Sequence, residues 1–382
     1  MNGIIDSTLR EGSQMVGVSF SLADKLAILE RLDRIGVEEL EIGVATRYDH
    51  DVPELLRQCR SSNFQARLAL WCRCRPEDIT CAAALKPDVI SLSIPGSDLH
   101  ISKKLGKSRS WVLDTVSNSI SQAQKCGLGY ISLGIEDATR ADQTFLEKII
   151  ATAQKSGVNR IRLADTVGVS TPLDLADQVS RLKEQFEIEI GVHCHNDFGM
   201  ATANSMAALD KGADWADVTV YGIGERTGNA RLEELTGFLT TQRGHNYDLS
   251  LLKGLVRDVA MSCGRSLDDH HPVVGSMIFA CETGLHLQGL RRQPATYEPY
   301  PPETVGLQRQ LLFGNKVGRL EIEDCMKGGK IKQSPPEYDR IIAEVRKEVA
   351  ILGYPLRRED FSTLVGNISI KHGNKCKVKP NH

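Results

Sequence analysis

The chain repeats one pattern, in which a short apolar run is followed by a longer amphipathic stretch. Eight such runs succeed one another at intervals of about 30 residues, the length of a strand with its crossover helix. After the first run, Leu22, Leu26 and Leu29 recur at helical spacing. Eight units of this kind predict a closed (β/α)8 barrel. The predicted strands are 4–6, 39–43, 67–72, 89–94, 130–135, 160–165, 188–192 and 215–220.

A doubly wound open sheet is the alternative fold for alternating strands and helices, but no glycine-rich dinucleotide fingerprint follows the first predicted strand. We therefore predict the α/β barrel, followed by a small, mainly helical lid region, because the alternating pattern stops after residue 250. The predicted parts are a catalytic barrel over 1–250, a lid subdomain over 265–330, a helical segment over 331–372 and a disordered tail over 373–382.

The composition is that of a soluble globular protein, with 382 residues, 41% hydrophobic residues, 25% charged residues and a net charge of −2. No basic run indicates a nucleic-acid partner, and no window reaches the roughly 18 apolar residues of a membrane helix. The ten cysteines are scattered and lack zinc-site spacing. The first strand begins too early to leave room for a signal peptide, so we expect a reduced, cytoplasmic protein.

Two histidines come directly after the apolar run of the seventh predicted strand, at its carboxyl end. His193 and His195 lie two residues apart, so both side chains leave the strand on the same face. Active sites of (β/α)8 barrels lie at this carboxyl end of the strands. Two neutral imidazoles with one carboxylate can hold a divalent ion and leave positions open for substrate oxygens. We therefore predict a metal pair rather than two unrelated core histidines.

Polar residues also follow other predicted strands, at the same end of the barrel. Arg10 and Glu11 follow the first strand, Glu136 the fifth, Thr166 the sixth and Asn229 the eighth. A 2-oxo acid could chelate the ion, which would polarise its carbonyl group. An arginine such as Arg10 would add positive charge where the alkoxide develops.

Three separated motifs resemble the homocitrate synthase and isopropylmalate synthase family, whose members are metal-dependent barrel enzymes that condense acetyl-CoA with a 2-oxo acid. The motifs are residues 6–14, DSTLREGSQ, residues 193–197, HCHND, and residues 222–229, GIGERTGN. Residues 71–73, 136–140 and 164–168 extend the similarity to the nitrogenase-associated homocitrate synthases. The resemblance reaches about residue 320 and implies Mn²⁺, Mg²⁺ or Zn²⁺ as cofactor and acetyl-CoA as co-substrate.

The resemblance also implies residue roles. Arg10 would polarise the carbonyl group, and Glu136, His286 and Tyr297 would perform the acid–base work. In the family the small domain reaches over the barrel of a second subunit, so we expect a homodimer in which His286 and Tyr297 act in trans. The implied metal ligands are Glu11, His193, His195 and Asn229, and the implied substrate-binding residues are Gln14, Glu41, Arg73 and Thr166.

The chain departs from the family at several positions. Cys281 and the segment 314–318 differ from the usual small-domain motifs. Lysine-pathway homocitrate synthases carry basic or imidazole groups for the distal carboxylate where this chain has Trp71 and Ser132. Similarity to the nitrogenase-type branch favours 2-oxoglutarate, with oxaloacetate, a phosphonopyruvate-like acid and pyruvate as alternatives.

Three other classes of protein share parts of this pattern. An acyl-CoA lyase on the same barrel would carry a catalytic cysteine in the loop after the eighth strand, and loop 222–229 has none. A non-haem iron oxygenase would place its two histidines and carboxylate on an antiparallel β-fold. A divergent, non-catalytic barrel would fit the altered small-domain motif. We predict an acyl-CoA-dependent acyltransferase.

Overall fold

The computed structural model describes residues 1–326 and 335–370. Contacts divide the chain into two compact units, Met1–Leu267 and Asp268–His382. The predicted tail over 373–382 lies outside the described residues, as do residues 331–334 and 371–372 of the predicted segment 331–372. No described helix has both the length and the apolar character that crossing a membrane requires.

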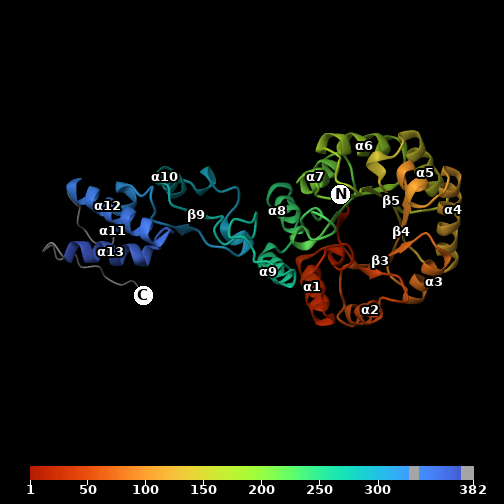
Figure 1. The fold of residues 1–382 in the computed structure, drawn as a ribbon, viewed down its shortest axis with the longest axis horizontal. Coiled ribbons are helices and arrows are strands. Elements are labelled where there is room, and N and C mark those ends of the chain that lie inside the picture. The colour runs from red at the N-terminus through yellow and green to blue at the C-terminus, as the bar shows by residue number, and fades with distance from the viewer. Residues whose placement is uncertain (327–334, 371–382) are drawn as a thin grey trace. The chain divides into compact units, whose positions relative to one another are not determined.

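The first unit is a closed barrel of eight parallel strands surrounded by helices (Figure 1). Each strand pairs with the next, and β8 closes the barrel by pairing with β1. This closure confirms the predicted (β/α)8 fold and excludes the open sheet. The strands are β1 Gly3–Asp6, β2 Glu39–Val44, β3 Arg67–Arg73, β4 Val89–Pro95, β5 Ile131–Glu136, β6 Arg160–Asp165, β7 Glu189–Cys194 and β8 Trp215–Val218.

Helices cover the outside of the barrel, and local sequence signals set their ends. Helix α1 begins where Ser21 and Asp24 form a capping box, and it ends at Gly36, whose φ of 96° suits glycine. Of the leucines at helical spacing, Leu29 is buried, as is Leu32 one turn further on, whereas Leu22 and Leu26 in the first turns are half-buried. The helices of this unit are α1 Leu22–Ile35, α2 Val52–Ser61, α3 Pro76–Leu85, α4 Arg109–Lys125, α5 Gln143–Lys155, α6 Pro172–Gln185, α7 Ala201–Asp210, α8 Leu232–Arg243 and α9 Leu252–Ser262.

The barrel interior contains charged side chains as well as apolar ones. Near the amino ends of the strands, the fully buried Arg160 donates to both carboxylate oxygens of Glu39, at 2.6 Å and 3.1 Å. Arg67 also pairs with Glu39, and Ser132 accepts a hydrogen bond from Arg160 at 3.1 Å. Buried charges are tolerated only when they are paired in this way.

The second unit is mainly helical, as the sequence predicts. A short parallel ladder joins β9 Ala280–Cys281 to β10 Gln310–Leu311. A separate apolar core includes Phe313, Ile322 and Phe361, with the Phe313 and Phe361 rings stacked 4.0 Å apart. The helices are α10 Gly284–Arg292, α11 Arg319–Met326, α12 Pro335–Leu352 and α13 Arg358–Ile370.

Replacing Arg160 with methionine should destabilise the barrel unit by about 3–5 kcal/mol, because Glu39 then keeps a buried charge with a single remaining arginine partner. Urea unfolding followed by tryptophan fluorescence measures this loss, since all three tryptophans, Trp71, Trp111 and Trp215, lie in the barrel unit.

Arg57→Met is the matched control. Arg57 pairs with Glu54 on the exposed surface of α2, so the unfolding midpoint should stay that of the parent. Equal midpoints for Arg160→Met and the parent would show that the buried pair does not stabilise the barrel.

Candidate active site

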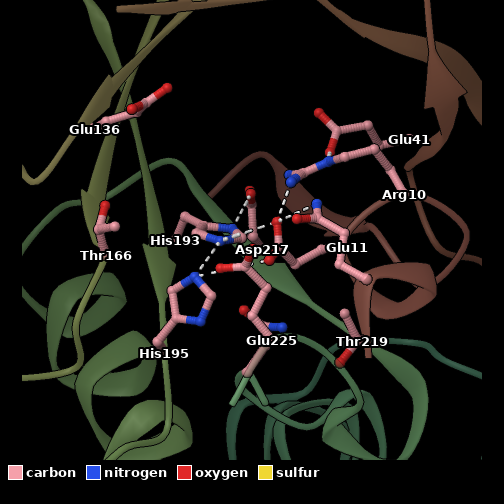
Figure 2. A network of polar contacts seen from close by, with 12 residues as sticks. Arg10, Glu11, Glu41, Glu136, Thr166, His193, His195, Asp217, Thr219 and Glu225 are labelled. Atoms are coloured by element: carbon pink, nitrogen blue, oxygen red, sulfur yellow. Dashed lines mark hydrogen bonds and ion pairs between the residues drawn. The ribbon is translucent and has the colours of Figure 1, made fainter. Parts of the chain in front are cut away.

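Three potential metal ligands converge at the carboxyl ends of the strands. His193 is the penultimate residue of β7, His195 follows that strand, and Glu11 lies in the loop after β1. All three are buried, and their ligand atoms lie within 4.8 Å of one another. The two Nε2 atoms are 3.3 Å apart, and each lies 3.8 Å from a Glu11 oxygen (Figure 2).

The protonation states of these groups fit a divalent cation. His193 Nδ1 lies 2.8 Å from Asp217 Oδ2, so Nδ1–H can donate to this carboxylate while Nε2 is directed toward the cluster. Burial, with a smaller effect from His193, lowers the pKa of His195 to about 3, so its ring is neutral at physiological pH. Burial alone would raise the pKa of Glu11, but Arg10 and the two imidazoles lower it, so Glu11 is ionised. Two imidazole nitrogens and one carboxylate suit Mn²⁺, Mg²⁺ or Zn²⁺.

A continuous series of buried polar contacts, here called the charge ring, surrounds this cluster. Arg10 pairs with Glu11 and, through Nε at 2.5 Å, with Glu41. Arg162 Nη1 lies 3.0 Å from Glu41 and 2.9 Å from Asp217, which holds His193. The members of the charge ring are Arg10, Glu11, Glu41, Arg162, Asp217 and His193.

Ion pairing keeps the ring ionised despite its burial. Burial alone would raise the pKa of Glu41, but Arg10 and Arg162 overcome this effect and hold that pKa at about 2. Burial alone would lower the pKa of Arg162, but Asp217 and Glu41 raise it above the ordinary arginine value. The ring therefore links the metal ligands to two permanent cations.

A cavity of about 450 Å³ opens above the charge ring. Cations, carboxylates and apolar side chains share its wall, so it suits a small anionic molecule with a hydrocarbon part. The lining residues are Arg10, Glu11, Gln14, Val44, Trp71, Ser93, Lys104, Gly134, Glu136, Arg162, Ala164, Thr166, His193, His195 and Glu225.

A second cavity of about 330 Å³ shares part of this wall. Trp71, Ser93, Lys104 and Glu136 line both cavities. The remainder of the second lining adds three cations and another tryptophan to several apolar residues. These additional groups are Arg73, Arg75, Lys107 and Trp111.

Glu136 is positioned on the wall that the two cavities share. Its Oε1 accepts a hydrogen bond from Ser93 Oγ at 2.8 Å, and its Oε2 pairs with Lys104 Nζ at 2.9 Å. His100 Nδ1 lies 3.8 Å from the same Oε2 atom. One carboxylate is thus accessible from two neighbouring binding spaces.

Comparison with known proteins agrees with this geometry. Residues 2–259 match the family model described as HMGL-like, and residues 273–351 match the model described as homocitrate synthase post-HMGL domain-like. The chain is 36% identical over 370 residues to 2-isopropylmalate synthase 2 of Caldanaerobacter subterraneus subsp. tengcongensis, covering 96% of each chain. It is 39% identical over 321 residues to homocitrate synthase of Frankia alni, covering 83% of this chain and 90% of that relative.

The chain belongs to the homocitrate synthase and isopropylmalate synthase family. The predicted class, an acyl-CoA-dependent acyltransferase, is confirmed, and the oxygenase is excluded. A solved HMG-CoA lyase from Bacillus subtilis matches with a TM-score of 0.62 over 69% of this chain and 94% of that chain. At 20% identity, that match shows the barrel fold alone.

The other sequence-predicted barrel residues occupy different positions around the site. Thr166 and Gln14 line the larger cavity, and Gln14 Nε2 lies 3.5 Å from Glu11. Asn229 is buried beside His195, and its Oδ1 has no hydrogen-bond partner among the described residues. Arg73 lines the second cavity, not the larger one, and pairs with Asp78 at 2.6 Å.

The two remaining predicted residues belong to the second unit of the enzyme. The rings of His286 and Tyr297 contact each other there, with centroids 4.3 Å apart. Both side chains are exposed within this unit. The spacing of eleven residues therefore brings the two predicted acid–base groups together.

Sequence reasoning missed Asp217 and Arg162, although a signal was available. Both are charged residues in the middle of predicted strands, two positions from another inward-facing residue. Charged residues at such positions require partners across the barrel. Their partners, however, come from other strands, so the sequence does not identify them.

Replacing Asp217 with asparagine should weaken Mn²⁺ binding about 10–100-fold, because His193 loses the carboxylate that orients its ring and raises its basicity. Mn²⁺ titration followed by electron paramagnetic resonance of the free ion measures the affinity.

Glu54→Gln on the exposed face of α2 is the control and should bind Mn²⁺ like the parent. Circular dichroism checks that Asp217→Asn is folded. A folded Asp217→Asn variant with parental Mn²⁺ affinity would exclude His193 as a ligand positioned by Asp217.

Proposed function

We propose that this enzyme condenses acetyl-CoA with a 2-oxo acid, of which 2-oxoglutarate, giving homocitrate, is the predicted substrate. The observation that carries the proposal is the position of Glu136 on a wall common to two cavities. One cavity contains the potential metal ligands, and the other collects cations beside tryptophans. A base between them could reach a substrate in either space.

Glu11, His193 and His195 would hold the divalent ion, with the unpartnered Oδ1 of Asn229 as a further oxygen donor. When bound, the ion supplies Lewis acidity for the carbonyl group of the oxo acid. Mn²⁺, Mg²⁺ and Zn²⁺ all suit this donor set.

Protein side chains would orient the oxo acid and stabilise developing charge. Arg10 offers a buried guanidinium beside the metal ligands, which would stabilise negative charge on the former carbonyl oxygen. Glu41 holds Arg10 in this position through its 2.5 Å contact. The hydroxyl of Thr166 and the amide of Gln14 would donate hydrogen bonds to the 1-carboxylate.

The second cavity suits the nucleotide part of acetyl-CoA. Arg73, Arg75 and Lys107 supply positive charge for phosphate groups, and Trp111 offers an aromatic face for a base. With the nucleotide held there, the thioester end would lie at the shared wall, next to Glu136. The methyl group would then approach the oxo acid in the larger cavity.

The proton transfers are assigned to Glu136 together with His286 and Tyr297. One member of this group removes a proton from the acetyl methyl group, which makes its carbon nucleophilic. The new C–C bond forms at the keto carbon, and the keto oxygen becomes a hydroxyl group. Water then cleaves the thioester C–S bond to give a carboxylate and the CoA thiol.

His286 and Tyr297 would act on the barrel of a second subunit, as the family resemblance implies. The homodimer and the cytoplasmic location predicted from the sequence stay predictions. Sedimentation of the full chain would measure the first of these directly.

The proposed reaction is tested by measuring CoA thiol release from acetyl-CoA with a panel of 2-oxo acids. We expect turnover with Mn²⁺, Mg²⁺ or Zn²⁺ that a chelator abolishes and added metal restores, because the ion polarises the carbonyl group. No oxo-acid-dependent thiol release from folded, metal-loaded protein would overturn the proposal.

Replacing Glu136 with glutamine should lower kcat about 10²–10⁴-fold, because the amide cannot accept the methyl proton. Binding of the oxo acid, measured by calorimetry without acetyl-CoA, should change little. Glu147→Gln, on the exposed side of α5, serves as the control and should retain parental kcat. Full activity of Glu136→Gln would remove Glu136 from the acid–base group.

A further inference from the structure

Arg162 presents two different edges of its guanidinium group. Its hydrogen bond to Glu41, at 3.0 Å, and its contact with Asp217, at 2.9 Å, are both made by Nη1. Among residues 1–326 and 335–370, Nε and Nη2 of Arg162 donate no hydrogen bond. The Nε–Nη2 edge is the side of a guanidinium that can bind a carboxylate through two parallel hydrogen bonds.

Gly134 leaves this edge uncovered. It lies on β5 beside Arg162 of β6, and both residues line the larger cavity. A Cβ atom at position 134 would lie 3.7 Å from Nε and 3.8 Å from Nη2. Any longer side chain at this position would therefore stand over the open edge.

The other cations that line the cavity are already assigned or paired. Arg10 is held between Glu11 and Glu41 and serves the keto oxygen in the proposed reaction. Lys104 pairs with Glu136 at 2.9 Å. Arg162 is thus the lining cation best placed to receive a further anion.

The surroundings of Arg162 suit a short hydrocarbon chain that ends in a carboxylate. Val44, Trp71 and Ala164 give the same cavity apolar wall. On β6, Ala164 pairs with His193, and Arg162 precedes Ala164 by two residues. Two residues of a strand span about 6.5 Å, so the backbone of Arg162 lies one layer deeper than the metal ligands.

We propose that the Nε–Nη2 edge of Arg162, left open by Gly134, binds a second carboxylate of the oxo acid. The substrate class is then the 2-oxo dicarboxylic acids. This inference rests on the proposed condensation for its kinetic test, and equilibrium binding tests it separately.

The first measurement compares 2-oxoglutarate with 2-oxohexanoate, which has a similar length and lacks the second carboxylate. We expect kcat/KM for 2-oxoglutarate to be at least about 100-fold higher, because the open edge of Arg162 would otherwise stay unpaired. Oxaloacetate and 2-oxoadipate measure the preferred length. If every dicarboxylic acid is a poorer substrate than the monocarboxylic acid, the inference is wrong.

Gly134→Val tests the subsite without removing the ion pairs of Arg162. We expect KM for the best dicarboxylic acid to rise at least about 10-fold, while kcat/KM for pyruvate, whose carbon chain ends at the methyl group beside the keto carbon, stays within about twofold, because only a longer acid reaches the covered edge. Gly129→Val, at an exposed position with open space, is the control and should change neither value. An equal loss for both acid classes in Gly134→Val would overturn the inference.

A fallback variant and a binding measurement test the subsite even if Gly134→Val does not fold or the enzyme does not turn over. If Gly134→Val does not fold, Gly134→Ala replaces it, since its Cβ would meet neighbours at 3.4 Å or more. Calorimetric titration of both acids into Mn²⁺-loaded protein, without acetyl-CoA, needs no turnover. Failure to release CoA with any acid refutes the condensation, whereas equal affinities of both acid classes for the parent protein refute the Arg162 subsite.

Discussion

The charge ring is the interaction on which the rest of this site depends. Each arginine of the ring lies between two carboxylates, and the last carboxylate holds the imidazole of His193. Because the ring is buried, removing one member leaves its neighbours with charges that water cannot solvate. The ring therefore fixes the positions of the potential metal ligands and of Arg10 together.

This arrangement also explains why the barrel interior contains charged residues where apolar side chains usually fill such barrels. The Arg160–Glu39 pair supports the amino-terminal part of the interior, and the charge ring lies nearer the active site. Paired charges hold the arginine side chains in fixed orientations, because guanidinium and carboxylate groups hydrogen-bond in a defined planar geometry. Apolar packing alone would not aim Arg10 or Arg162 at a substrate.

Glu136 lies on the wall between the larger cavity, which borders the charge ring, and the second cavity, which suits a nucleotide. Its two oxygens have different partners, the hydroxyl of Ser93 and the ammonium group of Lys104. A carboxylate held in this way can face both substrates of a condensation without changing position. In the proposed reaction the oxo acid occupies the larger cavity and acetyl-CoA the second cavity. Different residues can therefore select each substrate.

The sequence alone determined the barrel and the order of its strands. It also predicted that four residues meet, because local periodicity places each of them at a strand end and parallel strands bring those ends together. These residues are Arg10, Glu11, His193 and His195. The sequence did not identify Arg162 or Asp217 as members of the site. It also did not show that Arg73 lines the second cavity rather than the larger one. Those depend on which side chains meet across the barrel: Glu41, Arg162 and Asp217 come from β2, β6 and β8. Only closure of the barrel makes them neighbours, so tertiary structure decided how the predicted residues are held.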